Sequence, residues 1–436
     1  MAVKYIDVKA SSDLFAPAVR AFGDIAIIGR SGFGTAAAKP KDIGSPAEAA
    51  KSFPNGLTSL SGDAAKDSHA IIVPVDLPVG AAVRIGVAAD TEVRTVTKSE
   101  AVRTESEAVS GKHTLTLNRA LDREHKAGAV VEHESDLLRA ISAVFRQSPP
   151  PTRVWGVQVD FASPLWDAAL DEVGTLDVQI VALANMPLND ANKDTLGRLA
   201  DHVKNVGGDG KERIGVAMLD RDLPVDKMVE QNAAPVKNER MVLVAHRSPD
   251  DVAAATAGVI AGYRPHISML LKPIDVVMTG PFADSDVTLL DDARINWITS
   301  PVLLPGHAQY LGEGYTADEG GGKKYIDVVR TLDDVNFRIT AQLIRAIGNL
   351  RVSRVGLRSV VTLVESVLAP LVQQEVIEDF AVVIPLLVLY DKDPVQLNPA
   401  EEQKLKDARS MRSVPMTVSV VYAGAIHRLT IDLAFT

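Results

Sequence analysis

Three apolar runs indicate the fold class: VQIVAL at residues 178–183, IGVAML at 214–219 and MVLVA at 241–245. Each apolar run is long enough for one strand, and a fourth candidate strand covers residues 154–159. Helical stretches are predicted at residues 164–172, 192–205, 223–230 and 249–262. Near-continuous apolar strands separated by amphipathic helices are typical of a parallel sheet that is covered on both faces. The sequence from Val154 to Ile274 therefore predicts an α/β domain.

The flanking segments have a different character. Ile25–Ile28 reads as a buried strand, and the glycines that follow it to Gly34 have neither the GxGxxG nor the P-loop spacing, so we interpret them as a plain turn. Short strands separated by polar turns are predicted at residues 83–87, 92–96, 113–117 and 129–131. Helical periodicity is absent there, which indicates a small β-rich insertion on the surface of the protein.

The C-terminal third predicts an α+β unit. Helical spacing begins at Leu332 with Thr331 as a candidate N-cap, and a second helix covers residues 360–372. We interpret the apolar run from Phe380 to Tyr390 as a strand. A short helix at residues 399–409 follows, with Asn398 as its cap and a proline in its first turn.

The predicted fold class is thus α/β and α+β, with a parallel-sheet body, a β-rich inserted domain, an α+β C-terminal core and extended β-arms at both ends. The segments are an N-terminal arm (1–20), the first part of the core (21–75), the β-rich outer domain (76–135), the α/β domain (136–290), the C-terminal core (291–412) and a C-terminal β-arm (413–436).

The C-terminal end of the chain alternates apolar and polar residues with period two. Residues 416–422 and 429–435 read as two strands of a hairpin with Ala423-Gly424 at the turn, and residues 1–9 also read as a strand. Apolar strands at free termini invite pairing with another chain. The predicted inter-subunit arm residues are Val3, Tyr5, Ile6, Val8, Leu429, Ile431, Leu433 and Phe435.

Composition narrows the functional classes. A chain of 436 residues with a net charge of -10 does not have the basic character of a general nucleic-acid binder. It contains no cysteine, which excludes disulfides, thiolate metal sites and a cysteine nucleophile. We find no signal-peptide pattern and no uninterrupted run of about 18 apolar residues, so we expect neither export by a signal peptide nor membrane insertion.

Polar residues at the ends of the predicted strands are the candidates for chemistry, because open α/β sheets bind ligands there. They are Asp160, Asn185, Asp220, Asp222, His246 and Arg247. Asp220 and Asp222 suggest a metal-dependent hydrolase or transferase, whereas the simpler interpretation is that they cap the following loop. No GxSxG or HExxH motif is present. We therefore expect no enzyme activity, no catalytic or metal-binding residues and no cofactor, and keep the metal-dependent enzyme as the alternative.

Five arginines lie between residues 338 and 364 without a carboxylate among them, in a chain that is acidic as a whole. Arg338 and Arg345 are seven residues apart and so share a helix face. We call this set the basic stripe: Arg338, Arg345, Arg351, Arg354 and Arg358. It is either an ordinary solvated face whose acidic partners lie elsewhere in the fold, or a surface that docks an acidic partner.

The order of these parts resembles the contractile tail sheath family of phages and phage-derived injection systems. The segment from Val328 to Val335 (VVRTLDDV) resembles that family's V-x-R-T-L-x-x-I helix start, and Asn398-Pro399 and the terminal strands from Val414 to Leu433 also match. Near the start, Ile25 to Gly34 and the segment to Phe53 resemble the family's strand, glycine turn and short helix.

The resemblance implies a structural subunit of a helical sleeve built from stacked six-membered rings. In that family, terminal strands pair with neighbouring subunits, and the sleeve shortens to drive an inner tube through a cell envelope. It implies as partners further copies of the chain, the inner tube, and baseplate and tail-terminator proteins, but no nucleic acid. The basic stripe would face the tube. We expect assembly in the host cytoplasm into a virion tail or an injection particle.

Overall fold

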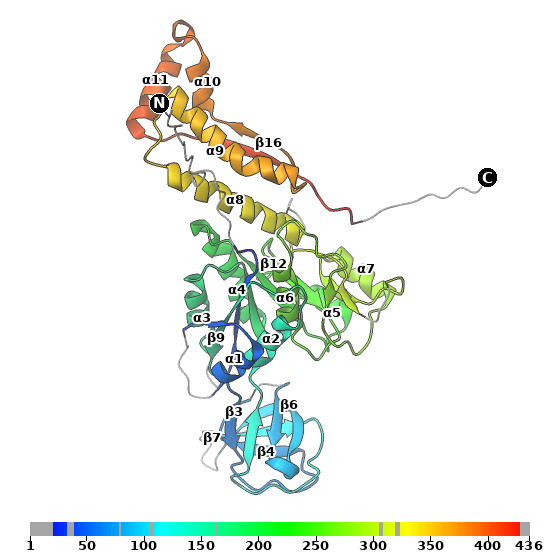
Figure 1. The fold of residues 1–436 in the computed structure, drawn as a ribbon. Coiled ribbons are helices and arrows are strands. Elements are labelled where there is room, and N and C mark those ends of the chain that lie inside the picture. The colour runs from blue at the N-terminus through cyan, green and yellow to red at the C-terminus, as the bar shows by residue number, and fades with distance from the viewer. Residues whose placement is uncertain are drawn as a thin grey trace, which may run out of the picture. The chain divides into compact units, whose positions relative to one another are not determined.

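The computed structural model describes residues 21–32, 39–77, 80–103, 109–161, 164–304, 308–318 and 323–427. The chain divides into two compact units. The larger unit covers Phe22–Ile326, and the smaller one, called the helical unit below, contains the described residues from Asp327 onward (Figure 1).

A mixed sheet forms the centre of the larger unit. In the described residues it has nine strands in the order β13-β15-β14-β12-β11-β10-β1-β9-β2. β9, β1, β10, β11, β12 and β14 pair in parallel, and the strands at the two ends pair antiparallel. This arrangement confirms the predicted parallel sheet. The strands are β1 (Asp24–Arg30), β2 (Lys41–Ile43), β9 (Arg153–Val159), β10 (Ile180–Leu188), β11 (Ile214–Leu219), β12 (Met241–Ala245), β13 (Pro273–Ile274), β14 (Asn296–Thr299) and β15 (Gln309–Leu311).

Helices cover both faces of this sheet (Figure 1). Ala26 and Ile28 of β1 share a buried core with the apolar residues of α3 and α4. Gly29 lies beside α2: a Cβ atom at this position would come within 3.0 Å of Leu137 Cα. The first glycine of the predicted turn therefore allows close helix–strand packing. The helices of this unit are α1 (Pro46–Ser52), α2 (Asp136–Phe145), α3 (Trp166–Gly174), α4 (Lys193–Asn205), α5 (Val225–Glu230), α6 (Val252–Gly262) and α7 (Asp284–Asp292).

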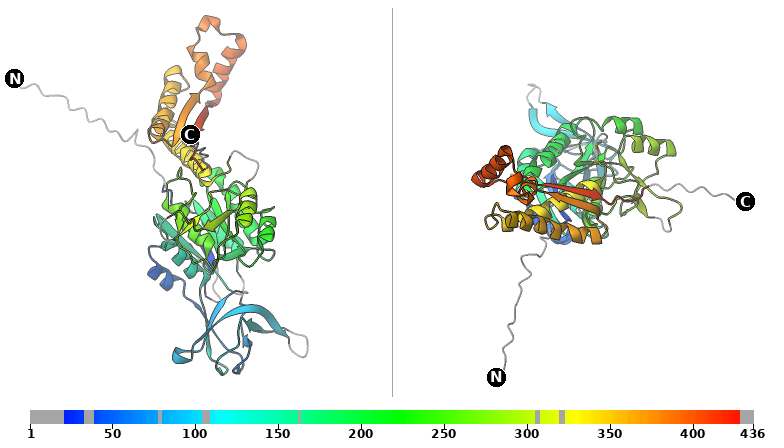
Figure 2. Two further views of the ribbon diagram at one scale, coloured as in Figure 1. Left: turned by 90° about the vertical axis from the view of Figure 1, so that its right-hand side faces the viewer. Right: turned by 90° about the horizontal axis from the view of Figure 1, so that it is seen from above.

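A second, antiparallel sheet forms the β-rich part, drawn mainly in cyan in Figure 2. Its order is β3-β8-β5-β6-β7-β4, so it includes two strands that precede the predicted 76–135 segment. Alternate residues such as Val83, Ile85 and Leu115 fill a core of their own. The strands are β3 (Gly56–Ser59), β4 (Ala70–Val73), β5 (Ala82–Ile85), β6 (Glu92–Arg103), β7 (Val109–Leu117) and β8 (Val130–His133).

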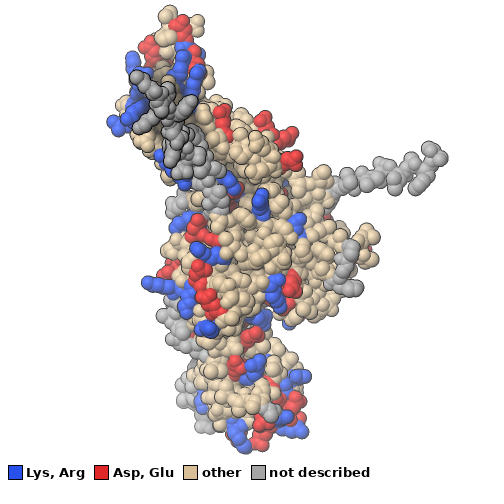
Figure 3. Space-filling model, in the orientation of Figure 1, with Lys and Arg blue, Asp and Glu red and all other residues tan. Residues whose placement is uncertain are grey.

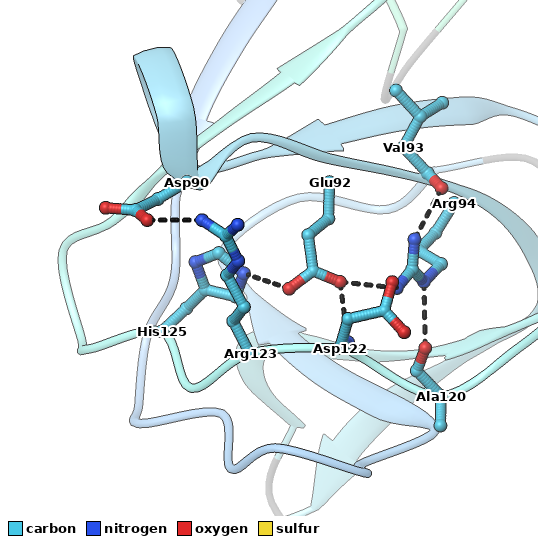
Figure 4. A network of polar contacts seen from close by, with 8 residues as sticks. All are labelled: Asp90, Glu92, Val93, Arg94, Ala120, Asp122, Arg123 and His125. Atoms are coloured by element: carbon cyan, nitrogen blue, oxygen red, sulfur yellow. Dashed lines mark hydrogen bonds and ion pairs between the residues drawn. The ribbon is translucent and has the colours of Figure 1, made fainter.

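A buried polar network ties the start of β6 to the turn after β7 (Figure 4). Glu92 forms an ion pair with Arg94, and both side chains are almost completely buried. Glu92 also accepts a hydrogen bond from the backbone N–H of Asp122 at 2.7 Å, and its Oε1 lies 3.0 Å from Nε2 of His125. Each buried charge in this network therefore has a partner, as burial requires.

The helical unit places two long helices against a small sheet. Val335 of α8, Val364 of α9 and Ile377 of β16 are buried in one core. The elements of the unit are α8 (Ile326–Ala346), α9 (Arg354–Gln373), β16 (Ile377–Val383), α10 (Pro385–Asp391), α11 (Pro399–Met411) and β17 (Thr417–Tyr422). The short helix predicted after Asn398 is confirmed, and Asn398 caps α11 by accepting a hydrogen bond from the backbone N–H of Glu401 at 2.9 Å.

Two predictions for this unit are wrong. The run from Phe380 to Tyr390 is not one strand: β16 ends at Val383, and Pro385 starts α10. Proline fits the first turn of a helix, and a short apolar run does not distinguish a strand from a buried helix. Thr331 is not an N-cap, because α8 begins at Ile326 and Thr331 is a buried residue inside it.

By length and composition, α9 is long and apolar enough to cross a membrane. Polar residues interrupt its sequence, so a search for an uninterrupted apolar run does not find this helix. Several of its apolar side chains pack against other elements of the helical unit. Val364 and Leu368 pack with β16 and β17, and Leu357 packs with α10 and α11. This packing buries part of the apolar surface of the helix, and Val355 stays 75% exposed.

Candidate assembly interface

The sheet of β16 and β17 is the main candidate interface. The two strands pair antiparallel, from Ile377 opposite Tyr422 to Val383 opposite Thr417. Within the described part of the chain this sheet has only two strands, so each of them has an edge with no neighbouring strand. One face of the sheet packs against α8 and α9 through Ile377 and Val418. One face of the sheet is thus fixed by packing, and among the described residues neither edge has a partner strand.

The end of β17 is fixed to the start of α8. The Tyr422 hydroxyl donates a hydrogen bond to Oδ2 of Asp327 at 2.6 Å, and Asp327 is buried in the first turn of the helix. Burial and this hydrogen bond raise the pKa of Tyr422, which therefore stays protonated and keeps its donor. The chain after Tyr422 starts from a defined position on the unit.

The strand predicted at residues 416–422 is confirmed as β17, although its partner in the described residues is β16. The predicted arm residues lie outside the described residues. They are Val3, Tyr5, Ile6 and Val8 at one end, and Leu429, Ile431, Leu433 and Phe435 at the other.

The five arginines of the basic stripe do not have equivalent surroundings. Arg338 forms an ion pair with Asp334, one turn earlier in α8, at 2.8 Å. Arg354 and Arg358 both pair with Asp391 of α10, at 2.9 and 3.1 Å. The structure brings this carboxylate to the stripe from a distant part of the sequence. Three arginines are therefore partly neutralised by the unit itself.

Arg345 and Arg351 differ from these three. Both side chains are exposed, and neither has an ion pair with any described residue. Arg351 donates a hydrogen bond to the backbone carbonyl of Gly348 at 3.1 Å. The arginines of the stripe that have no ion pair in the described residues thus lie at the end of α8 and in the loop before α9, while Arg354 and Arg358 share one carboxylate.

Arg330 is buried within the helical unit. It is 6% exposed, and burial lowers its pKa to about 10 against the opposing effect of Asp334, Asp327 and Asp333. These aspartates keep a buried guanidinium compensated inside the unit. Arg330 belongs to the motif that the sequence predicts at a helix start, but it lies inside α8. The periodicity of the sequence does not indicate that this side chain is buried.

The carboxyl ends of the parallel strands line a cavity of about 540 Å³ that includes Asp220, Asp222 and His246. Oδ2 of Asp220 accepts a hydrogen bond from Asn189 at 2.8 Å, and Oδ1 accepts one from the backbone N–H of Asp222 at 3.0 Å. Asp220 thus organises its own turn. No group of three His, Asp or Glu residues suited to a metal ion occurs in the described ranges, so their geometry gives the metal-dependent enzyme no support.

The other candidates at this edge are also engaged locally. Nδ2 of Asn185 donates a hydrogen bond to Oδ1 of Asp136 at 2.9 Å, and Arg247 donates one to the backbone carbonyl of Leu223 at 2.8 Å. Burial, assisted by the nearby Arg221, lowers the pKa of His246 to about 4. His246 is therefore neutral at physiological pH. Asp160, the remaining candidate, is buried at the end of β9.

No protein-family model matches the chain, and no curated protein matches it. Solved structures do. A chain in the 6-fold symmetrised baseplate of the anti-feeding prophage has a TM-score of 0.57 at 12% identity, over 100% of this chain and 99% of that one. The sheath complex of the extracellular contractile injection system PVC in its contracted state has a TM-score of 0.50 at 16% identity, over 68% and 81% of the two chains.

The helical sheath of the anti-feeding prophage in its contracted state gives a TM-score of 0.50 at 15% identity, over the same shares of the two chains. Because all three identities are low, the likeness concerns the fold. The chain has the fold of contractile tail sheath proteins.

Proposed function

We propose that this protein is a structural, non-enzymatic subunit of a contractile tail sheath. In this role it polymerises into a helical sleeve around an inner tube and shortens to drive the tube through a cell envelope. The fold supports the proposal, since it is shared with sheath chains of two injection systems. Baseplate and tail-terminator proteins would be its further partners.

The observation that carries the proposal is the open sheet of β16 and β17. In the described residues, both edges of this sheet lack a neighbouring strand and one of its faces is already buried, so strands from neighbouring copies can extend it without rearranging the unit. An arm of one copy that pairs with a different surface of the next makes a heterologous contact, and such contacts grow into open helical assemblies.

The terminal arms have suitable sequences for this pairing. Burying Leu429, Ile431, Leu433 and Phe435 in a neighbour would contribute about 6–12 kcal/mol before the costs of association, at about 1.5–3 kcal/mol per side chain. We propose that the arms stay attached while the subunit bodies move during contraction. The hydrogen bond between Tyr422 and Asp327 would fix the point from which the C-terminal arm leaves.

For the inner tube, the candidate surface in the sequence is the basic stripe, a contact that competes with docking between copies at the same arginines. Because Arg338, Arg354 and Arg358 have ion pairs within the unit, Arg345 and Arg351 are the arginines of the stripe most available for such docking.

A truncation that removes residues 423–436 tests the proposal. It retains β17 and the Tyr422 hydroxyl, whereas a cut at Val414 would also remove a strand that packs in the core of the unit. We expect the truncated protein to keep the melting temperature of the full chain and to remain unassembled in sedimentation and electron microscopy. Sleeves of normal length from the truncated protein would contradict the role of the arm.

A further inference from the structure

The connection between α8 and α9 forms an exposed end of the helical unit, which we call the α8–α9 tip. Its apolar side chains are unusually exposed: Ile344 by 65%, Ile347 by 72% and Val355 by 75%. Arg345 and Arg351 lie among them and are also exposed. Apolar side chains next to arginine are typical of protein–protein interfaces, where charge and burial act together.

The chain just after the other end of α9 carries the opposite charge. Glu375, Glu378 and Asp379 follow the end of α9, and all three are exposed. None of them forms an ion pair with a described residue. We call these three residues the acidic end. Figure 3 shows red side chains gathered on the right of the helical unit, near the place where α9 ends in Figure 1.

The two charged surfaces cannot neutralise each other within one copy. α9 has 20 residues, and at a rise of 1.5 Å per residue it holds the surfaces about 30 Å apart. This separation is far beyond the range of an ion pair, and it exceeds the screening length of about 8 Å at physiological ionic strength. Each surface is therefore available to a second molecule.

We propose that the α8–α9 tip of one copy docks on the acidic end of another copy. This inference rests on the proposed function and adds a second contact between copies, made by charged side chains and not by strand pairing, although Glu378 and Asp379 lie at the start of β16. The occupant is a second copy because the chain itself supplies the complementary charges, just before and just after α9. A contact of this kind is head-to-tail, so it propagates along an open assembly in the same way as strand addition.

Charge reversal tests the contact in the full-length protein. The double variant Arg345→Glu/Arg351→Glu would place like charges opposite each other, which disfavours association. The variant Glu375→Lys/Glu378→Lys would do the same from the other side. We expect each variant alone to raise the critical concentration for assembly by about tenfold or more.

Mixing the two variants is the decisive step. In an equimolar mixture, the acidic tip of the arginine variant can dock on the basic end of the glutamate variant, and the unchanged tip of the glutamate variant can dock on the unchanged acidic end of the arginine variant. We therefore expect an assembly in which the two variants alternate, with a critical concentration near that of the wild type. A mixture that assembles no better than either variant alone would overturn the proposal. Lys66→Glu/Arg119→Glu is the matched control, because it changes the same charge at exposed positions of the β-rich part.

The inner tube is the competing partner for the same arginines. If Arg345→Glu/Arg351→Glu assembled normally but no longer co-sedimented with the tube, the tip would be a tube contact and the proposal would be wrong.

Cysteine cross-linking separates this contact from the proposed function. The chain has no cysteine, so Arg345→Cys on one copy and Glu378→Cys on another would provide the only two thiols. With oxidised glutathione as the oxidant, we expect disulfide-linked dimers at a yield well above that of Arg345→Cys mixed with Glu100→Cys. Dimers without sleeves would leave the contact standing and remove the sheath role. A yield equal to the control would remove the contact even where sleeves form.

Discussion

A single buried carboxylate, Glu92, organises one end of the β-rich sheet. It is 6% exposed and contacts Arg94, His125 and the backbone of Asp122 (Figure 4). Burial acts to raise its pKa, but the hydrogen bonds from Asp122 and His125 and the charge of Arg94 outweigh burial, so the pKa of Glu92 lies below the ordinary value of 4.5. Its contribution to stability is therefore present above pH 4.5 and is lost as the pH falls through the lowered pKa.

The variant Glu92→Gln should lower the free energy of unfolding by about 3–5 kcal/mol at pH 7, because it leaves the guanidinium of Arg94 buried without its partner. Urea unfolding followed by circular dichroism measures this difference. The difference should shrink below pH 4.5, where the wild-type carboxylate also becomes protonated. Glu100→Gln is the control, since Glu100 is 60% exposed and should change stability little. Equal stability of wild type and Glu92→Gln at pH 7 would refute this account.

Single residues were the least predictable level of the molecule. The sequence shows five arginines without a nearby carboxylate, but Asp391 lies 33 residues after Arg358 and reaches it only through the packing of α10 beside α9. Similarly, Asp220 and Asp222 lie at the carboxyl ends of the strands, but Asp220 accepts hydrogen bonds from Asn189 and from the backbone of Asp222. Such partners depend on tertiary contacts, which periodicity does not encode.

Regular elements were much more predictable. Strands β9 to β12 and helices α4, α9 and α11 follow from apolar runs, helical spacing and an Asn cap. The prediction was wrong between Phe380 and Tyr390 because the same apolar run contributes first to a sheet and then, after Pro385, to a helix. The edge strands β16 and β17 are the elements on which the proposed assembly depends.

Hydrogen–deuterium exchange should detect pairing at these edges. In the unassembled protein, the edge amides of β16 and β17 have no partner strand among the described residues and should exchange quickly, whereas in the assembled sleeve they should become protected. The fully buried helix α6 is the internal control and should be slow in both states. Equal exchange of β17 before and after assembly would mean that neighbouring copies do not extend this sheet.

At the scale of the whole molecule, two kinds of contact would connect neighbouring copies. Strand addition at β16 and β17 would link copies through the terminal arms, and the α8–α9 tip would link them through complementary charge. The first depends mainly on backbone hydrogen bonds and apolar burial, and the second weakens as salt rises. A subunit with both kinds of contact can remain linked by its arms while its charged contacts are exchanged.

The most direct test of the central claim is a cryo-electron microscopy map of the assembled full-length chain. We predict a helical sleeve in which the sheet of β16 and β17 gains strands from the termini of neighbouring copies. A sheet that remains two-stranded in the assembly, with both termini folded back on their own subunit, would contradict strand addition. Compact particles of a single small size, with no helical assembly, would contradict the sheath role itself.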